Sequence, residues 1–324
     1  MTESTILPIP TGWFCVAFGH ELQAREVKPL EVFGRHLVMF RTTEGKARVL
    51  DAHCPHLGAH LARPITGGEG GKVDGDALRC PFHDWRWDGE TGKCVHIPYA
   101  KRIPENARTR AWPVVERGGL IMVWHGPEGE EPGFDLPTLE EFDGDAYTVV
   151  YRNAVDQKST PLDMGENSVD LAHFVTVHGL TEYPKPEDTT ITSEGERLCI
   201  SGPSDSPRAQ ELPFDLVLDR QFFGLGFVTI RFLGIPGTNP LLLITTTPLD
   251  ERNCVTRWTF FANKETADTI GVMFTEQLMQ GVIPDFPIWE HKVFVPRPIL
   301  CDGDGPIAEY RRWARQFYPE SAWS

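Results

Sequence analysis

Several features that mark other protein classes are missing from this sequence of 324 residues. It contains no run of 18 or more apolar residues, so we expect no membrane-spanning helix. The start, MTESTILPIPTGW, lacks a basic segment followed by an apolar run, which predicts no signal peptide and a cytoplasmic location. Basic residues are in deficit: 31 Lys and Arg against 46 Asp and Glu give a net charge of −15, which disfavours nucleic acid and anionic membranes as partners.

The chain has 7 cysteines. Because thiols stay reduced in the cytoplasm, this number indicates metal ligands and buried thiols rather than a disulfide framework. The composition otherwise suits a folded globular protein, with 40% hydrophobic and 24% charged residues, and the length accommodates two domains.

The first 125 residues predict a small antiparallel β domain, because short strand-like runs alternate with turn residues such as GKA, GGL and DGETGK. The clearest runs are Trp13–Ala17, Leu37–Arg41, Ala47–Asp51 and Leu120–Val123. GPEGEEPGFDLP at 126–137 is rich in Gly, Pro and Glu and is the best linker candidate. We therefore expect one domain over residues 1–127 and a second over 128–324.

The second half of the chain predicts an α+β domain. A segment suited to helix at 158–180 is followed by strand-like runs at Thr189–Ser201, Phe214–Phe232, Leu241–Pro248 and Cys254–Ala262. Residues 265–281 carry apolar side chains spaced by four, which is typical of an amphipathic helix. PIAEYRRWARQF at 306–317 predicts another, with Pro at its start, where a helix tolerates it.

Two short segments carry paired metal-ligand side chains, Cys54-x-His56 in CPHLGAH and Cys80-x-x-His83 in CPFHDWRW. A lone C-x-H pair is weak, since chance alone gives roughly 0.24 such pairs in this composition, but the second segment and the shared CP start strengthen it. Each segment supplies one Cys and one His, whereas zinc fingers usually take their Cys and His in separate blocks. This arrangement favours a [2Fe-2S] cluster with both thiolates on one iron and both imidazoles on the other. A structural zinc is the alternative.

Residues 166–178, ENSVDLAHFVTVH, contain a second group of potential ligands. Asp170 and His173 share one face of an ideal helix, but His173 and His178 would point about 140° apart. They can share a metal only if the helix ends between them, and the β-branched run Val-Thr-Val at 175–177 makes such an end plausible. Two imidazoles and one carboxylate form the ligand set of non-haem Fe(II) oxygenases. Two core histidines with a capping Asp are the alternative.

CPHLGAH and CPFHDWRWDGETGKC closely resemble the Rieske domain of Rieske non-haem iron oxygenases, and ENxxDxxHxxxxH resembles the catalytic motif of the same family. The resemblance implies an all-β Rieske domain that holds one [2Fe-2S] cluster through Cys54, His56, Cys80 and His83. It implies a helix-grip catalytic domain with an antiparallel sheet behind it. One departure is visible: 23 residues separate His56 from Cys80, more than the family usually has, and GGEGG at 67–71 fits the excess as an inserted loop.

The same resemblance implies a mononuclear Fe(II) site with His173 and His178 as ligands. Family members place a third ligand, an Asp, just ahead of a Pro-Ile-Trp-like segment, and PDFPIWEHK supplies Asp285 in that setting. Glu290 and His291 are the local competitors, and spacing by itself does not choose among the three.

Asp170 is implied as the bridge that carries electrons from the cluster of a neighbouring subunit, which requires an oligomer, and the family implies a homotrimer. The resemblance further implies an NADH-dependent ferredoxin reductase as electron donor, with O₂ and a hydrophobic small molecule as substrates. DWRWDGETGKC, PYAKRIPENARTRAWPV and DGPIAEYRRWARQFYPE look most similar to 3-ketosteroid 9α-hydroxylase oxygenase components and cholesterol 7-desaturases. The alternatives are a vanillate-type aromatic O-demethylase or hydroxylase, a sterol desaturase and, outside the enzymes, a Rieske-type electron carrier, which would leave the second motif without a purpose.

Overall fold

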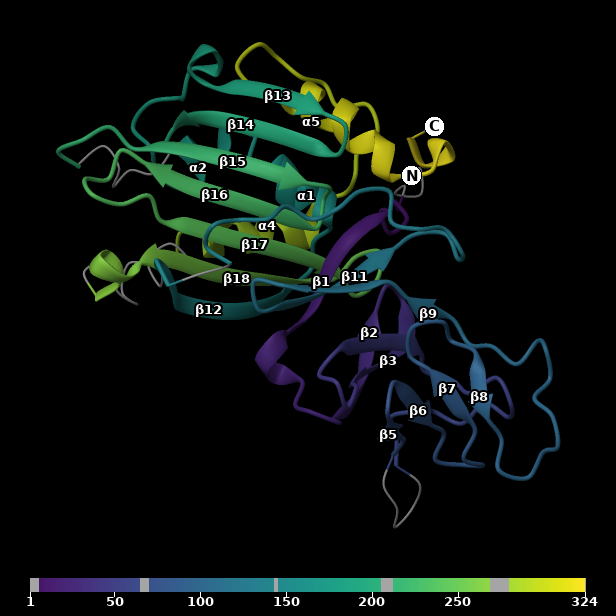
Figure 1. Cartoon of the computed structure of the whole chain (residues 1–324). Coiled ribbons are helices and arrows are strands. Elements are labelled where there is room, and N and C mark those ends of the chain that lie inside the picture. Colours follow the sequence, from purple (N-terminus) through teal and green to yellow (C-terminus); the bar gives the residue numbers. More distant parts are fainter. Residues whose placement is uncertain (1–5, 65–69, 143–144, 205–211, 269–279, 324) are drawn as a thin grey trace. The chain divides into compact units, whose positions relative to one another are not determined.

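The structure, a computed structural model, describes residues 6–64, 70–142, 145–204, 212–268 and 280–323. The chain divides into two compact units, Phe14–Gly133 and a unit that joins Met1–Trp13 to Phe134–Ser324 (Figure 1). The predicted boundary at 127/128 lies close to this division, but the first 13 residues group with the second unit. The reason is packing: Leu7 is buried in the core of that unit, and the Thr11 N–H donates to the Phe317 carbonyl at 2.8 Å. Within the described ranges no helix has the length and apolarity needed to cross a membrane.

The first unit is built from short strands, as the alternation of strand-like runs and turn residues predicts. Its sheets have the strand orders β1-β11-β10, β2-β3-β4-β9 and β5-β6-β7-β8. The elements are β1 (Gly12–Phe18), the 3₁₀ turn η1 (Gly19–Glu21), β2 (Val27–Val32), β3 (Arg35–Arg41), β4 (Ala47–Asp51), β5 (Lys72–Asp74), β6 (Ala77–Arg79), β7 (Arg86–Asp88), β8 (Cys94–His96), β9 (Ala111–Trp112), β10 (Val114–Arg117) and β11 (Leu120–His125).

The second unit contains one antiparallel seven-stranded sheet, in the order β12-β18-β17-β16-β15-β14-β13 (Figure 1). Its strands are β12 (Tyr147–Gln157), β13 (Thr190–Glu194), β14 (Arg197–Pro203), β15 (Val217–Phe223), β16 (Phe227–Leu233), β17 (Leu241–Pro248) and β18 (Cys254–Asn263). The central strands are rich in β-branched and aromatic residues, and every residue but one of β17 is buried, as expected of a strand covered on both faces.

The antiparallel sheets confirm the predicted fold class, but two long strand-like runs each form a hairpin instead of one strand. The run Thr189–Ser201 splits at Gly195, whose φ of +55° suits a tight turn between β13 and β14. The run Phe214–Phe232 splits at Gly224, with φ of +64°, between β15 and β16. The 11-residue strand β12 was not predicted.

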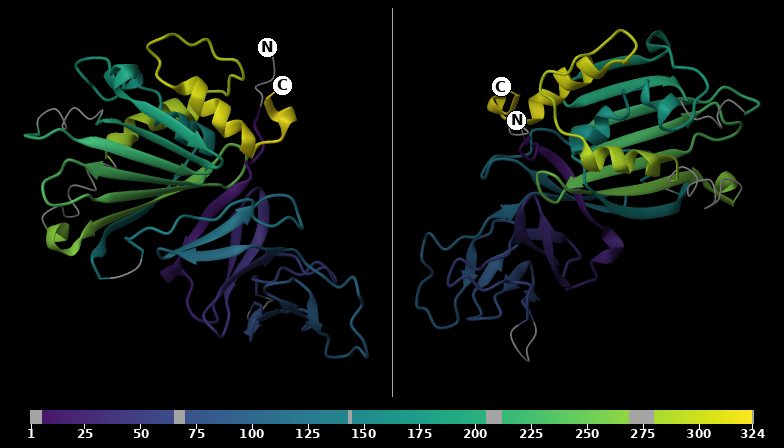
Figure 2. Two further views of the ribbon diagram at one scale, coloured as in Figure 1. Left: turned by 45° about the horizontal axis from the view of Figure 1, so that its top comes forward. Right: turned by 180° about the vertical axis from the view of Figure 1, so that it is seen from behind.

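Four helices of the second unit pack against one face of the sheet, which the reverse view in Figure 2 shows most clearly. They are α1 (Pro161–Glu166), α2 (His173–Thr176), α4 (Phe286–His291) and α5 (Ile307–Ala314), with 3₁₀ turns η2 (Pro186–Asp188), η4 (Ile283–Asp285), η5 (Arg315–Phe317) and η6 (Glu320–Trp323). The helix predicted at 306–317 is confirmed as α5 and η5. The helix predicted at 265–281 is described only at its ends, and residues 269–279 lie outside the described part of the chain, as do residues 65–69 of the glycine-rich insertion.

Candidate metal centres

The two Cys-His segments fold into similar tight loops in the first unit. In the first loop the Gly58 N–H donates to the Cys54 carbonyl at 2.8 Å, and Gly58 has a φ of +77°, a conformation that favours glycine. In the second loop the Asp84 N–H donates to the Cys80 carbonyl at 3.1 Å, and Asp84 has a φ of +60°. An ion pair with Arg79, at 2.6 Å and 3.0 Å, holds Asp84 in this conformation. Each loop therefore carries one thiol and one imidazole on a tightly constrained backbone.

The four predicted cluster ligands lie together at the tips of these loops. A hydrogen bond from Cys54 lowers the pKa of Cys80, opposed by burial and aided by backbone N–H groups of Phe82 and His83. The same hydrogen bond, together with burial, raises the pKa of Cys54. One thiolate is thus stabilised before any metal binds, and thiolate is the form that binds metals.

The imidazoles of the two loops are also close, and their surroundings fit a bound cluster. The rings of His56 and His83 have centroids 4.8 Å apart, and His83 Nδ1 is buried without a hydrogen-bond partner among the described residues. Trp85 stacks on His56 at 4.4 Å with an angle of 12° between the rings. Trp87 is fully buried in the same core as Cys54. The unpartnered nitrogen fits a metal ligand, and the two tryptophans limit access of water to the site.

The spread of these ligands argues against the zinc alternative. A tetrahedral zinc with ligands at 2.0–2.3 Å requires ligand atoms about 3.5 Å apart. Among the described residues, only His173, His178 and Asp285 bring three potential ligand atoms within 4.8 Å of one another. The two Cys and two His of the loops do not converge on one point, as a cluster with two separate irons requires.

The second group of potential ligands, His173, His178 and Asp285, lies at the ends of short helices in the other unit. His173 begins α2, a helix of four residues, and His178 follows its end. The helix stops because β-branched residues fill its last turn and Gly179 adopts a φ of +76°. Asp285 ends the 3₁₀ turn η4 and occupies the position just before the first residue of α4. The predicted break between the two histidines is confirmed.

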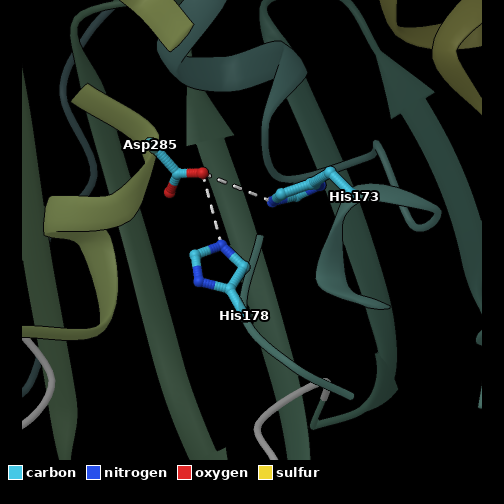
Figure 3. A group of neighbouring side chains, drawn as sticks. All are labelled: His173, His178 and Asp285. Carbon is cyan, nitrogen blue, oxygen red and sulfur yellow. Dashed lines mark ion pairs between the residues drawn. The ribbon is translucent and has the colours of Figure 1, made fainter. Parts of the chain in front are cut away.

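These three side chains converge on one point (Figure 3). The Nε2 atoms of His178 and His173 lie 3.3 Å and 3.8 Å from the same Asp285 oxygen. Asp285 is 2% exposed, and His173 Nε2 is buried without a hydrogen-bond partner among the described residues. A buried carboxylate facing two imidazoles matches the two-His, one-carboxylate set of non-haem iron sites. The competitors Glu290 and His291 are exposed.

Asp170 orients His173 through both its main-chain carbonyl and its carboxylate. His173 Nδ1 lies 2.8 Å from the Asp170 carbonyl oxygen, which fixes the proton on Nδ1 and leaves the Nε2 lone pair for a metal. The Asp170 carboxylate lies 3.6 Å from the same Nδ1. Burial lowers the pKa of His173, but the hydrogen bond to Asp170 and the charges of Asp170 and Asp285 outweigh it, so the pKa is raised. This pocket attracts positive charge, which a divalent cation provides.

Asn167 is a part of the site to which the sequence alone gave no role. Its side-chain amide donates to the second Asp285 oxygen at 3.4 Å, which turns the first oxygen towards the two histidines. The only sequence signal was its position at the start of the ENxxDxxHxxxxH pattern.

Comparison with known proteins agrees with both centres. Residues 12–109 match the model of the Rieske [2Fe-2S] domain, and residues 123–318 match the model of the 3-ketosteroid 9α-hydroxylase C-terminal domain. The oxygenase component of a 3-ketosteroid-9-alpha-monooxygenase from Rhodococcus rhodochrous is 34% identical over 95% of this chain and 83% of its own length. The chain belongs to the 3-ketosteroid 9α-hydroxylase family of Rieske oxygenases.

One further relative carries the name of a different reaction, and a solved structure shares the fold. Cholesterol 7-desaturase nvd 1 from Ciona intestinalis is 34% identical over 97% of this chain and 69% of its own length. A solved structure of NdmA from Pseudomonas putida CBB5 with caffeine superposes with a TM-score of 0.74 at 17% identity, covering 94% of this chain and 89% of that one. The last comparison supports the fold alone.

Membership in this family establishes the class of chemistry. The chain is a Rieske-type non-haem iron oxygenase, the terminal oxygenase of its system, and it uses one [2Fe-2S] cluster and one mononuclear iron. The electron-carrier and zinc-protein alternatives are therefore wrong.

Proposed function

We propose that this Rieske oxygenase hydroxylates a steroid-like hydrophobic substrate, with Cys54, His56, Cys80 and His83 as cluster ligands. His173, His178 and Asp285 are the proposed ligands of the mononuclear iron. The convergence of these last three side chains, in a chain of this family, is the observation that carries the proposal. In this proposal residues 1–127 form the domain that holds the cluster and stores the electron, and residues 128–324 form the domain that carries out the oxygenation.

When both groups are bound, the cluster delivers single electrons and the iron activates O₂ for insertion of one oxygen atom into a C–H bond. The chain's own contribution is to fix the ligands. Asn167 orients Asp285, and the Asp170 carbonyl sets the tautomer of His173. The Asp170 carboxylate, 37% exposed, is the proposed bridge to the cluster of a neighbouring subunit.

An apolar face of the sheet supports a hydrophobic substrate. The register pairs Ile230 with Leu242 and Val228 with Ile244, so these side chains share one face. Val282, which lies shortly before Asp285, packs into one cluster with Ile230, Leu242 and Ile244, and its aliphatic members Ile230 and Ile244 are only partly buried. Apolar surface left partly open beside a metal centre suits a hydrophobic ligand. The cholesterol 7-desaturase relative makes desaturation of a sterol the second candidate.

We also propose a homotrimer that takes electrons from NADH through a ferredoxin reductase in the cytoplasm. Exposed apolar side chains in each unit support the oligomer. Leu57, Phe82 and Tyr99 are 65%, 56% and 62% exposed in the cluster unit. Ile288 and Val293 are 47% and 58% exposed beside α4 in the other. Apolar surface of this kind marks protein interfaces, and a second copy of the chain is the proposed occupant. Light scattering should give three chains per particle.

Iron analysis of Asp285→Ala tests the metal assignment, with Glu290→Ala as matched control. The unaltered protein should hold about three irons per chain, two of them in the cluster. Asp285→Ala should hold about two irons per chain, keep the Rieske EPR signal and lose NADH-coupled turnover of 4-androstene-3,17-dione. Glu290→Ala should leave the iron content, the EPR signal and the turnover unchanged. An Asp285→Ala protein with its third iron and its activity intact would show that the assignment is wrong. Turnover of vanillate but of no steroid would overturn the proposed substrate class.

A further inference from the structure

A network of four charged side chains lies behind the proposed iron site. Asp163 and Glu166 come from α1, Lys292 directly follows α4, and Arg311 comes from α5. Lys292 Nζ lies 2.8 Å from Asp163 and 3.5 Å from Glu166. The Arg311 guanidinium makes two hydrogen bonds to Glu166, at 2.5 Å and 3.1 Å. The two positive and two negative charges cancel within the network.

These side chains are largely shielded from water. The side chains of Glu166 and Arg311 are 12% and 13% exposed, that of Asp163 is 18% exposed and that of Lys292 is 31% exposed. Ion pairs in such surroundings are screened by salt far less than pairs on the open surface, and the loss of one partner leaves an uncompensated charge. The network therefore constrains the geometry of the helices that carry it.

The network closes a ring of contacts that includes the iron ligand Asp285. Lys292 lies seven residues after Asp285, at the other end of α4, about 10 Å along the helix axis. Lys292 contacts α1, and the residue that follows α1, Asn167, donates back to Asp285 at 3.4 Å. Helix α4 is therefore attached to α1 at both of its ends. Arg311 adds a hydrogen bond to the Val295 carbonyl at 2.6 Å, which holds the segment beyond Lys292.

We propose that Lys292, Asp163, Glu166 and Arg311 act as a clamp that positions Asp285 against His173 and His178 and thereby sets the affinity of the site for Fe(II). The inference rests on the proposed function, because it takes these three residues as the iron ligands. All four clamp residues are positioning residues, since none of them contacts the ligand atoms. A change in the angle of α4 moves the Asp285 carboxylate away from the two imidazoles, whose positions depend on α1 and α2.

Metal affinity of protein with the cluster in place tests the clamp. The mononuclear iron is removed, Co(II) is titrated anaerobically as the probe, and binding is followed by its visible absorption. Lys292→Met should weaken Co(II) binding by about tenfold or more, the scale on which residues behind the ligands act. Lys292→Arg, which keeps the charge, should restore affinity to within about threefold. Lys264→Met is the matched control, because Lys264 pairs with Asp145 at 3.5 Å on the open surface of the same unit and should leave the affinity unchanged.

Three outcomes separate the clamp from the site itself. If Lys292→Met binds Co(II) like the unaltered protein while Asp285→Ala does not, the clamp is wrong and the ligand assignment stands. If Asp285→Ala also binds normally, the proposed iron site is wrong. If Lys292→Met weakens Co(II) binding and also lowers the unfolding temperature, Asp163→Asn distinguishes loss of the clamp from general destabilisation. This variant removes the 2.8 Å pair with Lys292 and leaves the pair of Glu166 with Arg311 intact. Normal Co(II) affinity in a folded Asp163→Asn protein would overturn the clamp.

Discussion

Substitution of Gly165 by alanine sets two opposing effects against each other. Gly165 lies in α1, where alanine is normally the better helix former by at most about 1 kcal/mol. A Cβ at this position would lie 2.1 Å from the Tyr310 hydroxyl oxygen and 2.8 Å from its Cζ. Tyr310 is fully buried and donates to the Leu162 carbonyl at 2.9 Å, so its ring has no free space into which to move. Helix propensity predicts a more stable protein, and packing predicts a less stable one.

The magnitudes favour packing. An extra methyl group in a filled core costs about 1–3 kcal/mol, and loss of the tyrosine hydrogen bond adds about 0.5–1.5 kcal/mol. Subtracting the gain in helix propensity leaves a net loss of about 1–3 kcal/mol. For a unit of roughly 200 residues this lowers the unfolding temperature by a few degrees to about ten.

Calorimetry of Gly165→Ala against Gly281→Ala isolates the contact. Gly281 is also helical, but a Cβ there would meet nothing within 4 Å, so its alanine variant should be as stable as the unaltered protein or slightly more stable. In the double variant Gly165→Ala/Tyr310→Phe the hydroxyl that meets the new Cβ is absent. The double variant should therefore lose less stability than the two single variants lose together. If Gly165→Ala unfolds at or above the temperature of the unaltered protein, the close approach of α1 to Tyr310 is not as the structure has it.

Two further predictions concern the cluster and the sheet. Trp85→Ala should raise the reduction potential of the cluster by tens of millivolts, because water admitted beside His56 stabilises the extra negative charge of the reduced state. Redox titration of the EPR signal measures this potential. Trp85→Phe should change the potential less. Burial raises the pKa of Asp250, but hydrogen bonds from the backbone of Arg252 and Asn253 and from the Asn253 side chain outweigh it and lower that pKa. A carboxylate whose pKa is lower in the folded than in the unfolded state stabilises the fold above the unfolded pKa of about 3.9, and this stabilisation is lost as the pH falls through the folded pKa. Asp250→Ala should therefore lower the unfolding temperature at pH 7 and by progressively less towards pH 3. An equal decrease in unfolding temperature at both pH values would contradict this.

The sequence predicted those features that depend on neighbouring residues. Strand-like runs with turn residues at both ends gave β4 and β17 their observed bounds, and the helix at the C-terminus followed from its apolar spacing. Each hairpin is predicted as one long strand because one or two glycines between β-rich runs do not distinguish a turn from a bulge. Strand β12 was missed because its alternation of apolar and polar residues is weak, and pairing with β18 along ten positions provides what the pattern lacks.

The candidate site shows the same limit. His173 and His178 lie in one short motif, so the sequence could propose them together. Asp285 is more than a hundred residues away, and spacing does not separate it from Glu290; the resemblance to the family selects Asp285, and the fold adds that Asp285 is buried whereas Glu290 is exposed. The clamp was not predicted, because Lys292 and Arg311 form no motif and their relation to Glu166 exists only after three helices have packed.

The three proposed iron ligands share a feature that explains why the site needs such support. None of them lies inside a regular helix: His173 starts α2, His178 follows its end, and Asp285 lies where a 3₁₀ turn passes into α4. A regular helix turns each side chain by about 100° from the last, so residues five apart diverge. The ring centroids of His173 and His178 are nevertheless 5.1 Å apart, because the helical hydrogen bonding stops after the Val177 N–H bonds to the His173 carbonyl. Irregular backbone brings the ligands together but holds them weakly, since short helices have little stability of their own. Precision at the metal therefore has to come from contacts between elements, and the partly buried ion pairs that join α1 to α5 and to the end of α4 are well placed to provide it.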